Sequence, residues 1–334
     1  MIRQLRDLFS SLRGGRPPAP DVPDICFLLS EYNRGWVLET ICRQIARHWP
    51  ASTEFVWTRR NRKFTAAIPP ARVYWFSHFQ LLLTALEQNP EVRQGRLMVW
   101  FTHPSKPEIS MEELVAGLNQ CHAVIFTCSL HRDAMLAEGV RPEIAHVVLG
   151  AADPEVFKPL PGIERDCIGF VSAYYERKRP ELMEALIRAM PEKKFLLVGP
   201  KADSMGKTDR MWTQYPHFER LRALPNLEYF EADYADYPRH YARMTHYLST
   251  SDLEGGPLSA IEGLFCGCQV VLSDTGFARD LAAVADGVEV VGLEAEAEEW
   301  VKAISTEGEG PTANIENLSW REFARTLHRL SKAS

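Results

Sequence analysis

Residues 251–277, SDLEGGPLSAIEGLFCGCQVVLSDTGF, are the stretch of this chain that decides the fold. The segment THYLSTS, which leads into this stretch, predicts a short buried strand. Pro257 suits the first position of a helix, where a missing N–H costs nothing. Glu254 would therefore end the strand, and Glu262 would lie early in the helix. Strand–turn–helix units of this kind build parallel α/β sheets.

The Gly-Gly-Pro turn between the two carboxylates is suited to hold a phosphate. Gly255 and Gly256 let backbone N–H groups approach a ligand closely, and the free N–H groups at the helix start, next to Leu258, attract an anion. Helical side chains lean towards the helix N-terminus, so Glu262 can reach back over the turn while Glu254 approaches from the strand. Carboxylates accept hydrogen bonds from hydroxyls, so one could hold a ribose diol and the other a sugar. This pattern predicts a nucleotide-sugar site.

The spacing of the two glutamates is a weak signal alone, because 44 acidic residues in 334 positions give about six such pairs by chance. The surrounding sequence, EGGPLSAIEGLFCGCQVVLSDTGF at 254–277, is more specific. It resembles the signature of retaining GT-B glycosyltransferases of family 4. In that signature a Glu, seven residues and a second Glu precede a Cys-Gly-x-x-Val-Val strand.

Further segments resemble the same family in the same order, over roughly residues 95–333. GAADPEVFKPL at 150–160 resembles its interdomain segment, and IGFVSAYYERKRPELMEALIRAMPEKKFLLVGP at 168–200 resembles the first strand, helix and second strand of its donor domain. LSWREFARTLHRL at 318–330 resembles its closing helix. Upstream, VWFTHP and AVIFTCSLHRDAMLAEGV resemble acceptor-domain strands that carry a His and a Ser.

Short apolar runs alternate with helical patterns along the whole chain, which predicts parallel sheets covered on both faces. We therefore expect an α/β protein of the GT-B class, with two doubly wound Rossmann-like domains and a cleft between them. Ligands of such sheets bind beyond the carboxyl ends of the strands. A chain of 334 residues also suits two domains. The expected segments are an N-terminal helix and linker at 1–20, an acceptor domain at 21–155, a donor domain at 156–315 and a helix at 316–334 that crosses back.

The net charge and the cysteines argue against nucleic-acid binding, a disulfide framework and a metal site. A net charge of −6 argues against a general nucleic-acid binder. Seven scattered cysteines without a secretory signal indicate reduced thiols in a cytoplasmic protein. The pair Cys266 and Cys268 is too close for a zinc hairpin and lacks a second pair, so we expect no metal and no cofactor.

Residues 1–13, MIRQLRDLFSSLR, form an amphipathic basic pattern ahead of the linker GGRPPAPDVP. Such a helix can lie on the inner face of a membrane, which would suit a lipid-linked acceptor. The alternative is that it packs on its own protein or on a subunit. No apolar run of about 18 residues is present, so we expect no transmembrane segment.

Lys178, in the segment ERKR at 176–179, matches the family's lysine that contacts the donor diphosphate. A lysine in a loop after a strand can neutralise charge on a leaving phosphate without a metal. A solvated basic turn is the alternative interpretation. Many relatives carry an arginine about five residues earlier, where this chain has Ala173, and Arg177 or Arg179 could compensate.

Four other positions, His103, Ser251, Gly199 and Gly35, are candidate site residues. His103 follows a predicted strand where the family has a histidine, and could orient the sugar or the acceptor hydroxyl. His78 follows another strand, and we favour a structural role for it. Ser251 could line the donor pocket, and Gly199 could give room for the nucleotide. Gly35 permits a tight turn into a helix where relatives often have Gly-Gly, although packing of the adjacent tryptophan explains that turn equally well.

The resemblance implies transfer of a sugar from a nucleotide diphosphate to a hydroxyl acceptor, with retention of anomeric configuration. The acceptor would be a glycan or a lipid-linked saccharide. Lys178 and the helix start at 256–258 would stabilise the leaving phosphate, Glu254 would hold the sugar and Glu262 the ribose. A nucleotide-sugar epimerase or hydrolase of the same architecture, and a non-catalytic binding or scaffold subunit, are the alternatives.

Overall fold

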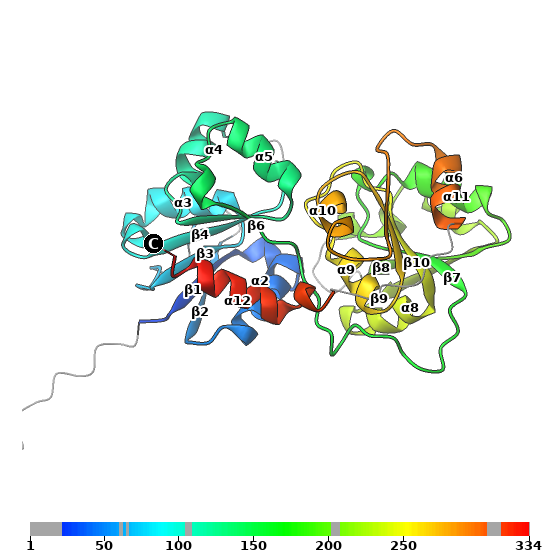
Figure 1. Cartoon of the computed structure of the whole chain (residues 1–334), viewed down its shortest axis with the longest axis horizontal. Coiled ribbons are helices and arrows are strands. Elements are labelled where there is room, and N and C mark those ends of the chain that lie inside the picture. The colour runs from blue at the N-terminus through cyan, green and yellow to red at the C-terminus, as the bar shows by residue number, and fades with distance from the viewer. Residues whose placement is uncertain are drawn as a thin grey trace, which may run out of the picture.

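The computed structural model describes residues 22–59, 63–64, 67–103, 109–201, 208–305 and 315–333. They form two layered α/β units that lie side by side (Figure 1). The helix and linker predicted at 1–20 lie outside the described residues. None of the helices in the described ranges is long and apolar enough to cross a membrane.

The N-terminal unit is a six-stranded parallel sheet in the order β2-β1-β3-β4-β5-β6. Its strands are β1 Ile25–Ser30, β2 Thr53–Thr58, β3 Val73–Phe76, β4 Arg96–Phe101, β5 Ala123–Phe126 and β6 Ala145–Val147. Its helices are α2 Val37–His48, α3 Phe79–Gln88, α4 Met111–Leu118 and α5 Ser129–Ala137.

The C-terminal unit is a second six-stranded parallel sheet, in the order β12-β11-β10-β7-β8-β9. Its strands are β7 Cys167–Val171, β8 Lys194–Pro200, β9 Leu227–Ala232, β10 Met244–Ser249, β11 Gln269–Ser273 and β12 Val288–Val291. Its helices are α6 Pro180–Ala189, α7 Phe218–Arg222, α8 Tyr237–Arg243, α9 Leu258–Phe265, α10 Ala278–Ala282 and α11 Ala297–Ser305.

Each sheet is buried on both faces, because alternate residues of its strands enter different hydrophobic clusters. In β1, Cys26 and Leu28 pack in one cluster, whereas Ile25, Phe27 and Leu29 pack in the other. Side chains along a strand point alternately to the two faces, so a strand covered on both sides is apolar throughout. The predicted pair of doubly wound α/β units is therefore confirmed.

Helix α12, Trp320–Leu330, leaves the C-terminal unit and packs on the N-terminal one, beside α2 (Figure 1). Its buried face, which includes Phe323 and Leu327, joins the same cluster as β1, and the Phe323 ring lies 5.3 Å from that of Trp100. The chain passes between the two units twice, near Ala152 and near Leu318. These two segments are hydrogen-bonded to each other, since Ala152 N–H donates to the Leu318 carbonyl at 3.0 Å. The last helix thus completes the core of the first unit.

The two units meet at the carboxyl ends of their strands. The His131 ring on α5 contacts the Glu254 carbonyl at 2.9 Å, and the Ser129 N–H donates to the Asp280 carboxylate at 2.7 Å. The backbones also approach closely, because a methyl group on Gly255 would overlap the Thr102 carbonyl oxygen. The edges where such sheets bind ligands therefore face one another.

Candidate functional site

A cavity of about 320 Å³ lies between the two units, where the loops after β1, β7, β8, β9 and β10 converge. The N-terminal unit contributes Gly35, Trp36, Val37 and Thr40 to its wall. The C-terminal unit contributes three of the charged side chains predicted from the sequence, Lys178, Glu254 and Glu262, together with Arg177. The folded chain therefore brings together residues of the motif segments that are up to 85 positions apart in sequence, from Arg177 to Glu262.

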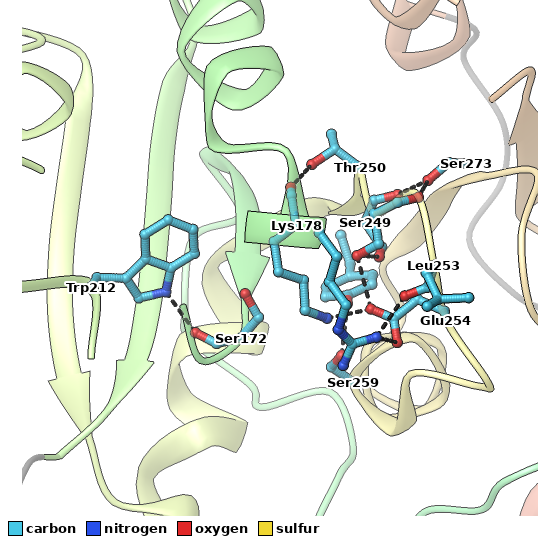
Figure 2. Close-up of polar contacts among 12 residues, drawn as sticks. Ser172, Lys178, Trp212, Ser249, Thr250, Leu253, Glu254, Ser259 and Ser273 are labelled. Carbon is cyan, nitrogen blue, oxygen red and sulfur yellow. Dashed lines mark hydrogen bonds and ion pairs between the residues drawn. The ribbon is translucent and has the colours of Figure 1, made fainter. Parts of the chain in front are cut away.

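Glu254 is buried and its carboxylate is shared by three donors. Lys178 Nζ forms an ion pair and hydrogen bond with Oε1, and Arg177 Nη1 lies 3.3 Å from Oε2. Ser251 Oγ donates to Oε1 at 2.8 Å. Figure 2 shows the Lys178 and Glu254 side chains directed toward one another. Burial alone would raise the pKa of the Glu254 carboxyl, but the Lys178 and Arg177 charges outweigh it and hold this pKa below its ordinary value. Glu254 is therefore a carboxylate at neutral pH.

The loop after β10 holds the segment that carries the two cations, mainly through the backbone carbonyls of that segment. Thr250 Oγ1 donates to the Lys178 carbonyl at 2.8 Å, and Asp252 N–H donates to the Arg177 carbonyl at 2.9 Å. Arg177 Nη1 also donates to the Leu253 carbonyl at 2.6 Å. These bonds tie the short helix Glu176–Lys178 to the loop after β10, so the ion pair is fixed from both sides.

Glu262 lies on the buried side of α9 and accepts from two tyrosines. Tyr234 OH donates to Oε1 at 2.5 Å, and Tyr241 OH donates to Oε2 at 2.9 Å. Burial raises the pKa of the Glu262 carboxyl to about 7, although both hydrogen bonds act in the opposite direction. The same cavity therefore contains one carboxylate that stays charged and one that titrates near neutral pH.

The turn between the glutamates differs in detail from the prediction. Strand β10 ends at Ser249, so Glu254 lies in the following loop rather than at the strand end. Pro257 is the residue before α9, one position earlier than predicted. Pro257 and Leu258 line the cavity.

Gly255 and Gly256 pack against protein instead of standing on the cavity wall. A methyl group on Gly256 would press on the Phe277 ring, and one on Gly255 would press on the N-terminal unit. Absence of a side chain at both positions is therefore required by packing.

His103 follows β4 and is half buried, and its Nδ1 has no hydrogen-bond partner among the described residues. Burial and the nearby Arg177 charge lower the pKa of its imidazole, whereas Glu254 acts in the opposite direction. The ring is therefore close to the ion pair and neutral at pH 7. His78 has a structural role, since its Nδ1 accepts from Gln80 N–H at 3.2 Å at the start of α3.

The other predicted residues lie at different depths around the cavity. Gly35 is on the wall with a φ of +69°, which favours glycine. Ser251 is fully buried behind Glu254. Gly199 packs under Trp212, because a methyl group there would come within 2.8 Å of its ring, so packing explains this glycine. Arg179 donates to the Leu293 carbonyl at 2.7 Å and does not line the cavity.

Several residues around the cavity were not predicted. Tyr234 and Tyr241 hold Glu262, His131 contacts the Glu254 carbonyl, and Tyr175 lines the wall next to Arg177. The repeated tyrosines in DYADYPRHY, at 233–241, were the one available signal. Among the described residues no group of three His, Cys, Asp or Glu side chains could hold a metal ion.

No protein-family model and no curated protein sequence match this chain. Solved structures match it over most of its length. Anabaena HepE in complex with UDP and glucose matches at a TM-score of 0.66 and 16% identity, covering 93% of this chain and 97% of that one. Sucrose-phosphate synthase from Thermosynechococcus elongatus matches at 0.68 and 14%, covering 92% and 98%. The lipopolysaccharide outer core galactosyltransferase WaaB matches at 0.61 and 12%, covering 92% and 98%.

At identities of 12–16% these similarities concern the fold. The arrangement shared with these structures is two six-stranded parallel sheets, each flanked by helices. The chain therefore has the GT-B fold, and the resemblance to GT-B glycosyltransferases of family 4 is confirmed at the level of the fold.

Proposed function

We propose that this protein is a retaining glycosyltransferase that moves a sugar from a nucleotide diphosphate to a hydroxyl acceptor without a metal. The observation that carries the proposal is the convergence of Lys178, Glu254 and Glu262 on one cavity between the two units. The Lys178 cation suits the diphosphate of such a donor. The Glu254 carboxylate suits the sugar hydroxyls, and the Glu262 carboxylate suits the ribose hydroxyls.

In the proposed reaction the bond between the anomeric carbon and the leaving phosphate oxygen breaks on the face where the acceptor oxygen bonds. The acceptor proton passes to the leaving phosphate. Lys178 and the N-terminus of α9 stabilise the negative charge on that phosphate. Glu254 holds the sugar hydroxyls and Glu262 the ribose diol, while neutral His103 orients the sugar or the acceptor hydroxyl.

A uridine diphosphate sugar is the donor that the comparisons favour. HepE has been solved with UDP, with UDP-glucose and with UDP and glucose. The G117R variant of TarM, a further structure similar to this chain at a TM-score of 0.55 and 15% identity, has been solved in a complex that contains UDP. We propose a glycan or a lipid-linked saccharide as the acceptor. A lipid-linked acceptor would suit an enzyme on the cytoplasmic face of a membrane, held there by the basic amphipathic pattern of residues 1–13.

The test is a thermal-shift panel with UDP-, GDP-, ADP-, TDP- and CMP-sugars, followed by product analysis for each donor that binds. One class of nucleotide should raise the unfolding temperature of the wild type. Glu262→Ala should abolish the shift, because the ribose diol loses its acceptor, whereas Glu219→Ala on the exposed side of α7 should retain it.

The products separate the possible activities. Donor consumption that requires an added saccharide or lipid-linked acceptor supports transfer, and consumption of the donor alone supports a hydrolase or epimerase. Binding without turnover supports a non-catalytic subunit. The absence of a shift with every donor contradicts the nucleotide-sugar site itself.

A further inference from the structure

Arg210 lies over two aromatic rings that line the cavity, one from each unit. Its guanidinium carbon is 5.0 Å from the centroid of the Trp36 ring and 5.6 Å from that of Tyr175. Both rings belong to the cavity wall. Arg210 comes from the connection between β8 and α7. It lies outside every motif segment described above, and the nearest of these segments ends with β8.

The position of Arg210 is set by hydrogen bonds to the loop after β7. Tyr174 N–H donates to the Arg210 carbonyl at 2.8 Å. Two residues later, the Trp212 ring N–H donates to the Ser172 carbonyl at 2.7 Å (Figure 2). Trp212 is fully buried, so this anchor is rigid. The segment around Arg210 is thus fixed beside the cavity.

The guanidinium of Arg210 retains its hydrogen-bonding capacity. Within the ranges that the structure describes, it forms no ion pair with a carboxylate and donates to no other group. An arginine stacked on aromatic faces keeps its N–H donors in the guanidinium plane, directed away from those faces. Arg210 can therefore bind an anion without breaking a contact.

The charges already on the wall favour a further cation. Lys178 and Arg177 both lie against Glu254, so one negative charge offsets one of their two positive charges. A nucleotide diphosphate brings at least two negative charges, more than the remaining one balances. Ala173, also on the wall, contributes a methyl group and no charge. Arg177 lies 5.1 Å from the same Tyr175 ring as Arg210, and an anion near this ring would relieve their repulsion.

We propose that Arg210 is a further binding residue for the donor diphosphate, presented by the Trp36 and Tyr175 rings as the two units come together. The inference rests on the proposed function and names a cation that the motif segments do not contain. Because Trp36 belongs to the N-terminal unit, the arginine reaches its binding position only when that unit is docked. Phosphate binding is thereby linked to closure of the cavity.

The experiment compares UDP with uridine as probes, by isothermal titration calorimetry of the full chain. The variants are Arg210→Gln, Arg210→Lys and the control Arg222→Gln, which removes an exposed arginine of α7. Loss of one charge-assisted phosphate contact should weaken UDP binding by about tenfold and leave uridine binding within about twofold. Arg210→Lys keeps the charge without the planar fork, so it should fall between wild type and Arg210→Gln.

The outcomes distinguish this inference from the proposed function. Equal UDP affinity of the wild type and Arg210→Gln, with both folded, overturns the role of Arg210 but leaves the donor site intact. Equal loss of UDP and uridine affinity also overturns it, because that result indicates a change of shape. If Arg210→Gln does not fold, the test uses Arg210→Lys. A UDP affinity of Arg210→Lys equal to that of the wild type then overturns the role of the Arg210 guanidinium. A wild type that binds no nucleoside diphosphate contradicts the proposed function itself.

Discussion

The pKa of Glu262 makes the stability of the C-terminal unit depend on pH in a way that one substitution can isolate. Burial raises this pKa from its ordinary value of 4.5 to about 7. A carboxyl group with a raised pKa in the folded state stabilises the fold at low pH. This stabilisation is fully present below pH 4.5, is lost as the pH rises towards 7, and changes little above that. Glu262→Gln has no titrating group and removes the dependence.

The magnitude follows from the size of the rise. One pKa unit corresponds to about 1.4 kcal/mol, so the whole rise corresponds to about 3 kcal/mol of unfolding free energy. Most of it, about 2 to 3 kcal/mol, falls between pH 5 and pH 8. The wild type should therefore lose this amount relative to Glu262→Gln over that interval.

Urea unfolding at half-unit pH steps, followed by tryptophan fluorescence, measures the difference directly. Subtraction of the Glu262→Gln curve from the wild-type curve removes the contribution of all other titrating groups. Glu219→Gln, an exposed residue, should give a flat difference from the wild type. A difference between wild type and Glu262→Gln that is also flat from pH 5 to pH 8 would refute the burial argument.

Three further predictions concern contacts around Glu254. Lys178→Met leaves the buried Glu254 carboxylate with one cation fewer and should lower the free energy of unfolding in urea by about 3 kcal/mol. The double variant with Glu254→Gln should lower this free energy by less, and a larger loss in the double variant would contradict the ion-pair interpretation. Gly255→Ala should separate the units and raise the radius of gyration in small-angle X-ray scattering, whereas Gly292→Ala, which projects into open space, should not; no difference between the two would argue against the close approach. His131→Ala should cost about 1 kcal/mol at pH 7.5, and because burial lowers the pKa of this imidazole, the wild-type advantage should shrink as the pH falls below 6.5; a constant advantage at pH 5 would exclude that linkage.

The parts of the site that could be predicted are those in which sequence order fixes geometry. Strand β10, its loop and α9 follow one another within about 20 residues, so the pattern around Glu254 and Glu262 placed both near one sheet edge. Lys178 follows β7, the strand next to β10, and parallel neighbours end at the same edge. The alternation of apolar runs and helices was likewise sufficient for the fold class.

The parts that could not be predicted depend on packing between distant segments. Gly199 and Gly256 are explained by the Trp212 and Phe277 rings, which lie far from them in sequence. Glu254 was expected at a strand end, but no local signal indicates that the strand stops at Ser249. The contact between Arg210 and a ring of the other unit depends on how the units dock, and no periodic pattern encodes it.

The return of α12 to the first unit has a consequence for the order in which the protein is built. A chain is synthesised from its N-terminus, and domains generally fold as they emerge. Here the hydrophobic cluster that includes Ile25 and Phe27 is closed by Trp320, Phe323 and Leu327. The hydrophobic core of the first unit is therefore completed last, after the second unit has been synthesised. Translation that stops before Trp320 would spare the second unit and leave the first with an open core.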